Sequence, residues 1–238
     1  MCRTFHLFIF LLSFFVITAA SGNYPPHTEN LKLGILPPDT LRNNQMFYNG
    51  RLWKNLYYMV KEDQFLFSSA FLKGTVTING KTYSNIRLKY DLFKDEILTP
   101  FGPGDVLQMN KEMVDSFSIY FQDNIYRFVS LPEDTDEALK GYVNVLYQGK
   151  IALYAKYIKK INRPGVENEP DRFYQLNRIY VLKNKQLYQI ANKNDLFKVL
   201  KDKKNLIREY SKKNNVVIEK DMPESFVPVI RYYDSMNQ

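Results

Sequence analysis

The clearest pattern of apolar and polar positions in the chain lies within residues 71–98. Two short runs of strand-forming residues, 75–78 and 81–83, flank Asn79-Gly80, and both residue types adopt the positive φ angles that a type I′ turn requires. Beyond this hairpin, apolar side chains alternate with charged ones at Ile86, Leu88 and Tyr90. That alternation predicts a strand with one face in a core and one in water, so we expect an antiparallel meander to begin here.

Similar patterns recur through the middle of the chain. Short apolar or alternating runs predict further strands and hairpins at residues 106–109, 117–121, 125–130, 142–147, 150–157, 179–182 and 186–190. Within residues 132–140, Asp134 or Thr135 followed by early acidic residues predicts one or two helical turns. Residues 158–178 contain Pro164-Gly165 and many polar side chains, and we expect them to form a long polar loop.

The periodicity becomes helical in the last fifth of the chain. Asn194 is the predicted cap of a helix over residues 195–200, and Asp202 is the predicted cap of a helix that ends at about Lys213. A last helix follows, bent or delayed by Pro228, with an inward face formed by Phe226, Val229, Ile230 and Tyr233. The expected fold class is α+β and mainly β: an antiparallel β-meander of short hairpins capped by two or three C-terminal helices.

Residues 1–20 have the features of a secretory signal peptide. Arg3 precedes an apolar run over residues 7–17, and Thr18, Ala19 and Ala20 are small residues suited to cleavage after Ala20. The alternative is an uncleaved anchor helix, although the run is shorter than the ~20 residues that a membrane span needs. No cysteine directly follows the run, so we do not expect a lipoprotein.

The remaining chain divides into a leader and one domain. Residues 21–45 are rich in proline and predict a flexible leader that ends in one strand near residues 31–35. Residues 46–238 are expected to form a single β-rich domain whose helical part covers about residues 192–238. The expected location is the periplasm or the exterior, in soluble form after cleavage.

Cysteine and histidine are almost missing from the predicted mature chain. Cys2 and His6 lie in the predicted signal peptide, and His27 lies in the leader. A folded core without these residues cannot assemble a Ser-His-Asp or Cys-His nucleophile system, and zinc, haem-thiolate and iron–sulfur sites lose their usual ligands. We therefore predict no cofactor, no metal site and no catalytic residues of these kinds; carboxylate, lysine, tyrosine and serine chemistry stays open.

Basic residues are concentrated in one part of the chain. Residues 150–213 contain 17 Lys and Arg against 6 Asp and Glu, a net charge of +11. This asymmetry favours an anionic partner, such as a lipid surface or a polyanionic glycan, and because export separates the protein from nucleic acid we predict no nucleic-acid partner. The candidate binding residues are Lys203, Lys204, Lys212 and Lys213. The alternative is a lysine-rich face that is simply solvated.

Acidic residues cluster after the best-defined strand, at Asp91, Asp95 and Glu96. Paired carboxylates are what glycoside hydrolysis needs, with one protonated acid and one ionised partner, and they can also bind calcium. Solvated acidic residues at a strand end are the simpler explanation. The many tyrosine and phenylalanine residues could form a sugar platform or a lipid-lining sheet, or pack on a half-buried sheet.

Several segments resemble a group of exported proteins of Bacteroidota. They are GTVTINGKTYSNIRLKYDLFKDEI (74–97), VLYQGKIALYAKY (145–157), YVLKNKQLYQIANKNDLFKVLKDKKNLIREYSKKNNV (180–216) and VIRYYDSM (229–236). The group shares a Gly-Lys hairpin, a lysine-rich helix and a terminal tyrosine-containing helix; Leu200-Lys201-Asp202 stands where many members have Phe-Pro-Asp. The resemblance implies an envelope location and supplies no catalytic residues.

Three functional hypotheses follow from the sequence. The first is a non-enzymatic exported envelope protein that binds a protein or an anionic surface. The second is a periplasmic carrier of a lipid or another hydrophobic ligand, held in an apolar pocket under the C-terminal helices. The third is a carboxylate-only glycan hydrolase.

Overall fold

The computed structural model describes residues 49–131, 136–165 and 169–236. The predicted signal peptide, the leader with its strand near residues 31–35, the domain start at residues 46–48, and the expected caps Asp134 and Thr135 lie outside these residues. No helix within the described residues has both the length and the apolar character needed to cross a membrane.

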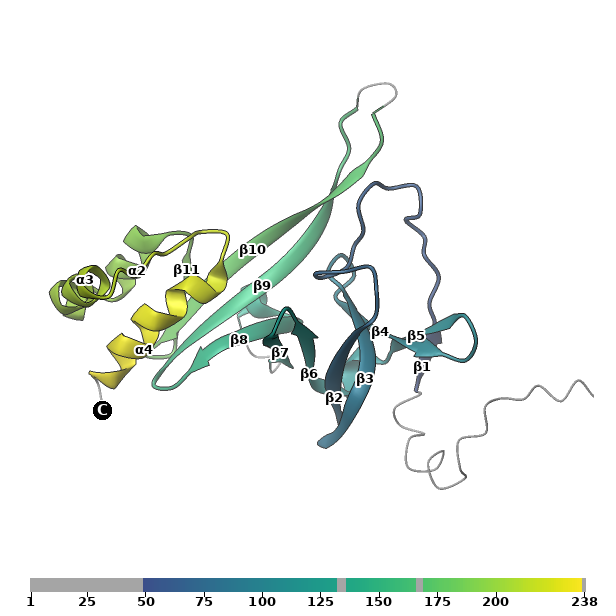
Figure 1. Ribbon diagram of the computed structural model, residues 1–238, viewed down its shortest axis with the longest axis horizontal. Helices are drawn as coiled ribbons and strands as arrows, with labels where there is room; N and C mark the ends of the chain where they lie inside the picture. Colours follow the sequence, from purple (N-terminus) through teal and green to yellow (C-terminus); the bar gives the residue numbers. More distant parts are fainter. Residues whose placement is uncertain (1–48, 132–135, 166–168, 237–238) are drawn as a thin grey trace, which may run out of the picture. The chain divides into compact units, whose positions relative to one another are not determined.

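The described residues form a sheet of 11 antiparallel strands (Figure 1). The strands are β1 (Gly50–Leu52), β2 (Leu72–Ile78), β3 (Lys81–Asp91), β4 (Glu96–Phe101), β5 (Asp105–Met109), β6 (Val114–Phe121), β7 (Asn124–Ser130), β8 (Tyr142–Gln148), β9 (Ile151–Asn162), β10 (Arg172–Lys183) and β11 (Gln186–Ile190). Their order is β1-β5-β4-β3-β2-β6-β7-β8-β9-β10-β11. Within the described residues, each run predicted to be a strand lies in one of them, except that β9 begins one residue after the predicted start at Lys150, so the expected meander is confirmed.

The opening hairpin has the predicted turn and one irregularity that bends the sheet. Asn79 and Gly80 both have positive φ, 48° and 76°. Gly74 pairs with Ile86 but Val76 pairs with Tyr83, so β3 carries an extra residue there and Asn85 has a φ of 57°. This bulge changes which face the alternate residues occupy, and strands bend at such positions. β3 stays paired with β2 from the bulge to Leu88, and from Lys89 onward it pairs with β4.

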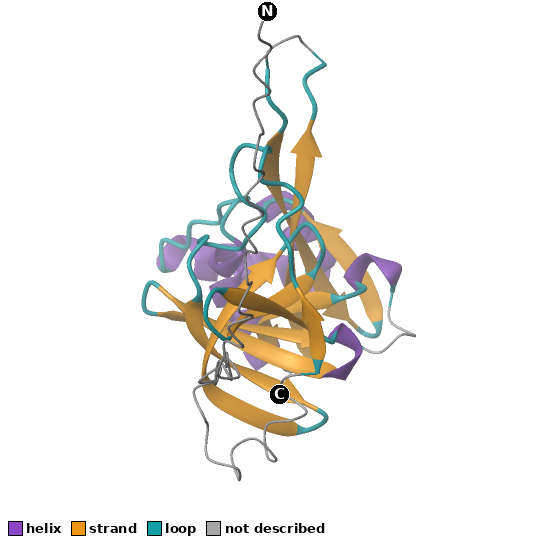
Figure 2. Ribbon diagram, turned by 90° about the vertical axis from the view of Figure 1, so that its right-hand side faces the viewer, coloured by secondary structure: helices purple, strands orange, loops and turns teal. Residues whose placement is uncertain are grey.

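The prediction of a long polar loop over residues 158–178 is wrong. β9 and β10 pair without interruption from Ile151 opposite Lys183 to Asn162 opposite Arg172, which leaves residues 163–171 as the connection. Figure 2 shows both strands running on together beyond their neighbours. The outer part of this ribbon buries few side chains, Phe173 among them, so polar residues are tolerated at most of its positions. Such a ribbon leaves no clear hydrophobic pattern in the sequence.

Helices follow the last strand. They are α2 (Lys193–Val199), α3 (Lys204–Lys213) and α4 (Val227–Ser235), with 3₁₀ turns η3 (Lys201–Lys203) and η4 (Pro223–Phe226). The predicted inward residues Phe226, Val229, Ile230 and Tyr233 are all buried, in one cluster with side chains of β9 and β10. The expected helical cap is confirmed, and Pro228 stands in the first turn of α4.

Two predicted helix caps are wrong. Asn192, not Asn194, caps α2, and its Oδ1 accepts hydrogen bonds from the amides of Asn194 and Asp195 at 2.8 and 3.1 Å. The Asp202 carboxylate instead accepts hydrogen bonds from Lys183 Nζ at 2.6 Å and from the Tyr233 hydroxyl at 2.9 Å. A charged ammonium and a hydroxyl bind the carboxylate more strongly than the single backbone amide that a helix cap would offer. Asp202 therefore links the helices to β10.

Aromatic rings fill the interior of the meander. Tyr90 lies 5.1 Å from Phe117 and 5.2 Å from Phe128, and the Phe117 and Phe128 rings stack at 4.7 Å. Tyr142 meets Phe117 edge-on at 5.1 Å. All four side chains are at most 1% exposed. Edge-to-face and offset contacts of this kind give a dense core, so much of the tyrosine and phenylalanine content serves packing.

Candidate functional site: a cleft beside Asp91

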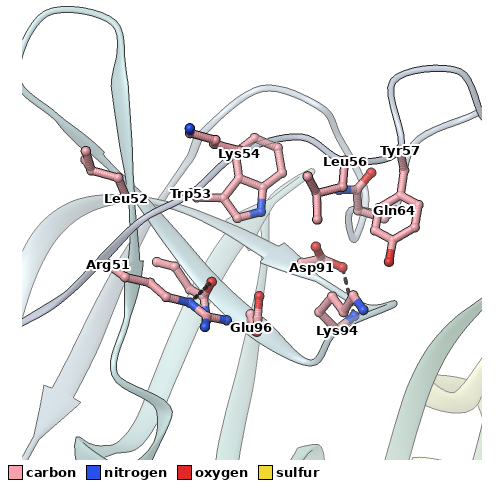
Figure 3. Close-up of a pocket in the computed structure, with 11 residues that line it drawn as sticks. Arg51, Leu52, Trp53, Lys54, Leu56, Tyr57, Gln64, Asp91, Lys94 and Glu96 are labelled. Atoms are coloured by element: carbon pink, nitrogen blue, oxygen red, sulfur yellow. Dashed lines mark hydrogen bonds and ion pairs between the residues drawn. The ribbon is translucent and has the colours of Figure 1, made fainter.

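An open cleft of about 440 Å³ lies between one face of the sheet and the segment that leaves β1 (Figure 3). The floor is formed by Arg51, Gln108, Glu96 and Asp91, from strands β1, β5, β4 and β3. The segment of residues 53–64 provides the roof, with Trp53, Leu56, Tyr57 and Gln64. The cleft therefore combines charged and amide groups below with aromatic and apolar groups above.

Strand register places the floor residues on one face. Arg51 lies directly opposite Gln108, and Asp91 lies directly opposite Glu96. Directly opposed residues of antiparallel strands project to the same side, so each pair reaches the cleft together. Arg51 then ties the floor together, because its Nε donates to Gln108 Oε1 at 2.9 Å and its Nη2 to Glu96 Oε1 at 3.3 Å.

The roof segment has no regular secondary structure between residues 53 and 60, yet both of its ends are fixed. The Trp53 amide donates to the Val106 carbonyl at 2.8 Å, and the Gln64 carbonyl accepts from the Leu92 amide at 2.9 Å. The Tyr57 ring packs edge-on against Phe93 at 4.9 Å. Aromatic anchors thus hold an irregular segment over the floor. No pattern in the sequence predicts a cleft at these residues.

Asp91 is a buried acid with an unsatisfied oxygen. Its residue is 1% exposed, and its Oδ1 accepts hydrogen bonds from the amides of Phe93 and Lys94 at 2.9 and 3.0 Å. Its buried Oδ2 has no hydrogen-bond partner. Burial raises the pKa of Asp91 to about 6, with a small contribution from the Glu96 charge, although the two amides and the nearby Gln64 side chain oppose the shift. Asp91 therefore changes its charge in mildly acidic solution.

The structure separates Asp95 from the other two acids of the predicted cluster. Asp95 Oδ1 accepts a hydrogen bond from the Tyr90 hydroxyl at 2.5 Å, and its other oxygen forms ion pairs with Lys111 and, at 3.7 Å, with Lys156. The Tyr142 amide also donates to this carboxylate at 3.4 Å. Asp95 is thus the centre of an internal network, and only Asp91 and Glu96 reach the cleft.

The four predicted basic residues do not share one face. Lys203 lies in η3 and is half-buried, while Lys204 and Lys212 are exposed on α3. Lys204, Arg208 and Lys212 follow one another at intervals of four, which places them in one stripe along the helix. Lys213 is rotated by about 100° from Lys212. The coherent basic surface is therefore the stripe Lys204–Arg208–Lys212, which we call the α3 stripe.

Comparison with known proteins gives no match. No protein-family model fits the chain, and neither the curated proteins nor the solved structures provide a similar sequence or fold. In the part of the chain that the structure describes, no three His, Cys, Asp or Glu side chains gather in a way that could hold a metal ion. The functional argument therefore depends on the cleft and on the surfaces around it.

Proposed function

We propose that this protein is a non-enzymatic, exported protein of the cell envelope that binds a saccharide unit of an envelope glycan in the Asp91 cleft. The observation that carries the proposal is the cleft itself, with aromatic rings opposite a row of hydrogen-bonding side chains. Export is supported by the signal-peptide features of residues 1–20 and by the resemblance to exported proteins of Bacteroidota.

The cleft offers the groups that a sugar ring needs. A sugar has apolar C–H faces and a rim of hydroxyls, and each hydroxyl both donates and accepts hydrogen bonds. Trp53 and Tyr57 supply aromatic surface, while Arg51 and Gln108 supply donors. Glu96 supplies acceptor oxygens, and its charge is balanced by Arg51 at 3.3 Å. Sites of this kind combine apolar walls with a few well-placed polar groups.

Binding is favoured over hydrolysis because of the position of Asp91. Its raised pKa and the opposing Glu96 resemble the acid pair of a glycosidase. A general acid must come within hydrogen-bond distance of the bond that it protonates, directly or through one water. Asp91 lines the cleft but is only 1% exposed, and its unpartnered oxygen is buried. A substrate in the cleft therefore has no direct access to a proton on that oxygen.

A hydrophobic carrier is also less well supported than saccharide binding. The carrier hypothesis places its ligand inside the curled meander, beneath the C-terminal helices. The meander interior is occupied by the stacked rings of Phe117 and Phe128 with Tyr90 and Tyr142 around them. The side chains below the helices, including Ile207 and Ile230, are fully buried against one another and against the sheet.

Trp53→Ala is expected to weaken saccharide binding about tenfold, or ~1.4 kcal/mol, because one aromatic contact is lost. Isothermal titration calorimetry with oligosaccharides released from the envelope of the producing organism measures the affinity. Tyr120→Ala is the matched control, since Tyr120 is 40% exposed and lies outside the cleft. Equal affinities of Trp53→Ala and the unaltered protein would refute the cleft as the binding site. If the protein cleaves the oligosaccharide and Glu96→Gln does not, the function is hydrolysis and not binding alone.

The α3 stripe is a second candidate surface, for an anionic partner. Lys204, Arg208 and Lys212 are exposed, and none has an ion pair within the described residues. Reversing all three to glutamate is expected to lower, markedly, the salt concentration that elutes the protein from dextran sulfate, because fewer counterions are displaced. A triple reversal at Lys73, Lys81 and Lys185, none of which belongs to α3, gives the same change of net charge. Equal shifts for both variants would show that net charge alone decides retention.

A further inference from the structure

Large apolar side chains are exposed at the tip of the roof segment. Leu56, Tyr58 and Met59 are 74%, 76% and 76% exposed, whereas Tyr57 between them packs inward against Phe93. Exposed apolar residues are ordinary when scattered singly, but a contiguous group indicates a contact surface. Here three of four consecutive residues present their apolar surface to water.

The tip is held in this conformation by the residues on either side of it. The Val60 amide donates to the Tyr57 carbonyl at 3.0 Å, which closes a turn around Tyr58 and Met59. The backbone of Lys61 is then fixed to the start of β10. Its amide donates to the backbone carbonyl of Asp171 at 2.8 Å, and its carbonyl accepts from the amide of Phe173 at 3.0 Å. The exposed side chains therefore belong to an anchored turn with defined ends.

Two lysine residues flank this apolar group in the chain. Lys54 and Lys61 stand on either side of it in the chain, are exposed, and have no ion pair among the residues that the structure describes. The nearby acids are compensated: Glu62 lies 3.9 Å from Arg172, and Asp63 lies 3.1 Å from Lys159. The tip therefore carries two uncompensated cations and no uncompensated anion.

We infer that the tip, residues 54–61, docks the protein on an anionic lipid bilayer. Leu56, Tyr58 and Met59 enter the boundary between headgroups and acyl chains, and Lys54 and Lys61 contact the lipid phosphates. A bilayer interface matches this arrangement because it offers an apolar layer directly beneath a negative one, and lysine near such a surface is attracted to the anionic headgroups. Tyrosine suits this boundary, with an apolar ring and a polar hydroxyl.

Docking of this kind has a consequence for the cleft. Trp53, Leu56 and Tyr57 line the cleft from the same segment that carries the tip. A membrane-bound tip would therefore hold the mouth of the cleft close to the lipid headgroups, where envelope glycans are attached or pass. The docking inference itself does not depend on what the cleft binds.

Vesicle co-sedimentation tests the inference. The protein recovered after export is mixed with vesicles of phosphatidylglycerol and phosphatidylcholine in equal parts, or of phosphatidylcholine alone. We expect binding to the mixed vesicles, and a loss of about tenfold or more in Leu56→Ser/Met59→Ser because two apolar insertions are removed. Ile125→Ser/Val217→Ser is the matched control, since these side chains are 70% and 69% exposed elsewhere on the surface. All variants share one N-terminus, so its contribution cancels.

Each outcome decides the inference. Loss of binding in the tip variant alone, together with weaker binding of Lys54→Glu/Lys61→Glu, supports it. Equal binding by the tip and control variants overturns it, as does equal binding to both kinds of vesicle by the unaltered protein. No binding to either vesicle also overturns it and leaves the tip as a contact for a protein. The saccharide affinity of the unaltered protein is measured separately, without lipid, and tests the cleft independently of these results.

Discussion

Replacing Asp95 with alanine is expected to lower the free energy of unfolding by about 3 kcal/mol. The substitution removes the partner of the Tyr90 hydroxyl and leaves Lys156, whose residue is 8% exposed, without its counter-charge. Burial already lowers the pKa of Lys156, and Asp95 is the group that opposes this shift. We expect a cost at the low end of the range for broken buried pairs because Lys111, the other cation, is 41% exposed and can turn to solvent.

Urea unfolding at neutral pH measures this cost. Adding Lys156→Met to Asp95→Ala should recover part of the lost stability, since it removes the buried charge that Asp95→Ala leaves behind. Tyr90→Phe is the control for the lost hydroxyl contact and should cost about 1 kcal/mol. A cost of under about 1 kcal/mol for Asp95→Ala would mean that solvent screens the network as it screens a surface pair.

Replacing Asp91 with asparagine is expected to remove a pH dependence from the stability of the protein. The native pKa of Asp91 is about 6, above its ordinary value of 3.8, so between these values the folded state binds more protons than the unfolded state. Stability from this group is therefore fully present below about pH 4 and is lost as the pH rises to about 6. The difference between the folded and the ordinary pKa of Asp91 corresponds to a loss of up to about 3 kcal/mol in the free energy of unfolding. Asp91→Asn has no titrating group at this position, so it cannot show this loss.

The measurement is the free energy of unfolding of both proteins, by urea, at several values from about pH 4 to about pH 7.5. The free energy of unfolding of the unaltered protein should fall, relative to that of Asp91→Asn, as the pH rises across this range. Any fixed cost of the new amide, which places a donor where Oδ2 lacks a partner, is the same at every pH and cancels. Parallel curves would show that Asp91 has an ordinary pKa. Glu112→Gln, at an exposed residue, is the matched control.

Local patterns in the sequence were sufficient for most of the strands and for the helical end. Asn79-Gly80 specified its turn because few residue types tolerate positive φ at both central positions. The inward faces of β3 and α4 followed from periods of two and about 3.6, since these periods are properties of single elements. Short elements with weak patterns were missed: β1 has no buried residue, and β4 contains Pro100.

The candidate site was predictable only in part. Asp91 and Glu96 were singled out as acids after a strand, and the structure brings them into one cleft because they face each other across β3 and β4. Asp95, between them in the chain, has a φ of 57° at the turn and points to a different set of partners. Gly141 is a second example. A Cβ added at this position would lie 1.8 Å from Asp95 Oδ2, so the site requires glycine, and no local sequence pattern predicts this requirement.

By itself, therefore, the sequence determined the hairpins, the helical faces, the mainly β fold class and the residue types left for chemistry. These depend on neighbours within a few positions, for which turn geometry and periodicity are enough. Only the tertiary structure decided the partner of Asp202, the length of the β9–β10 ribbon, the separation of Asp95 from Asp91, and the cleft with its apolar tip. Each of these depends on residues far apart in the chain, whose meeting is set by packing and by competition among alternative partners.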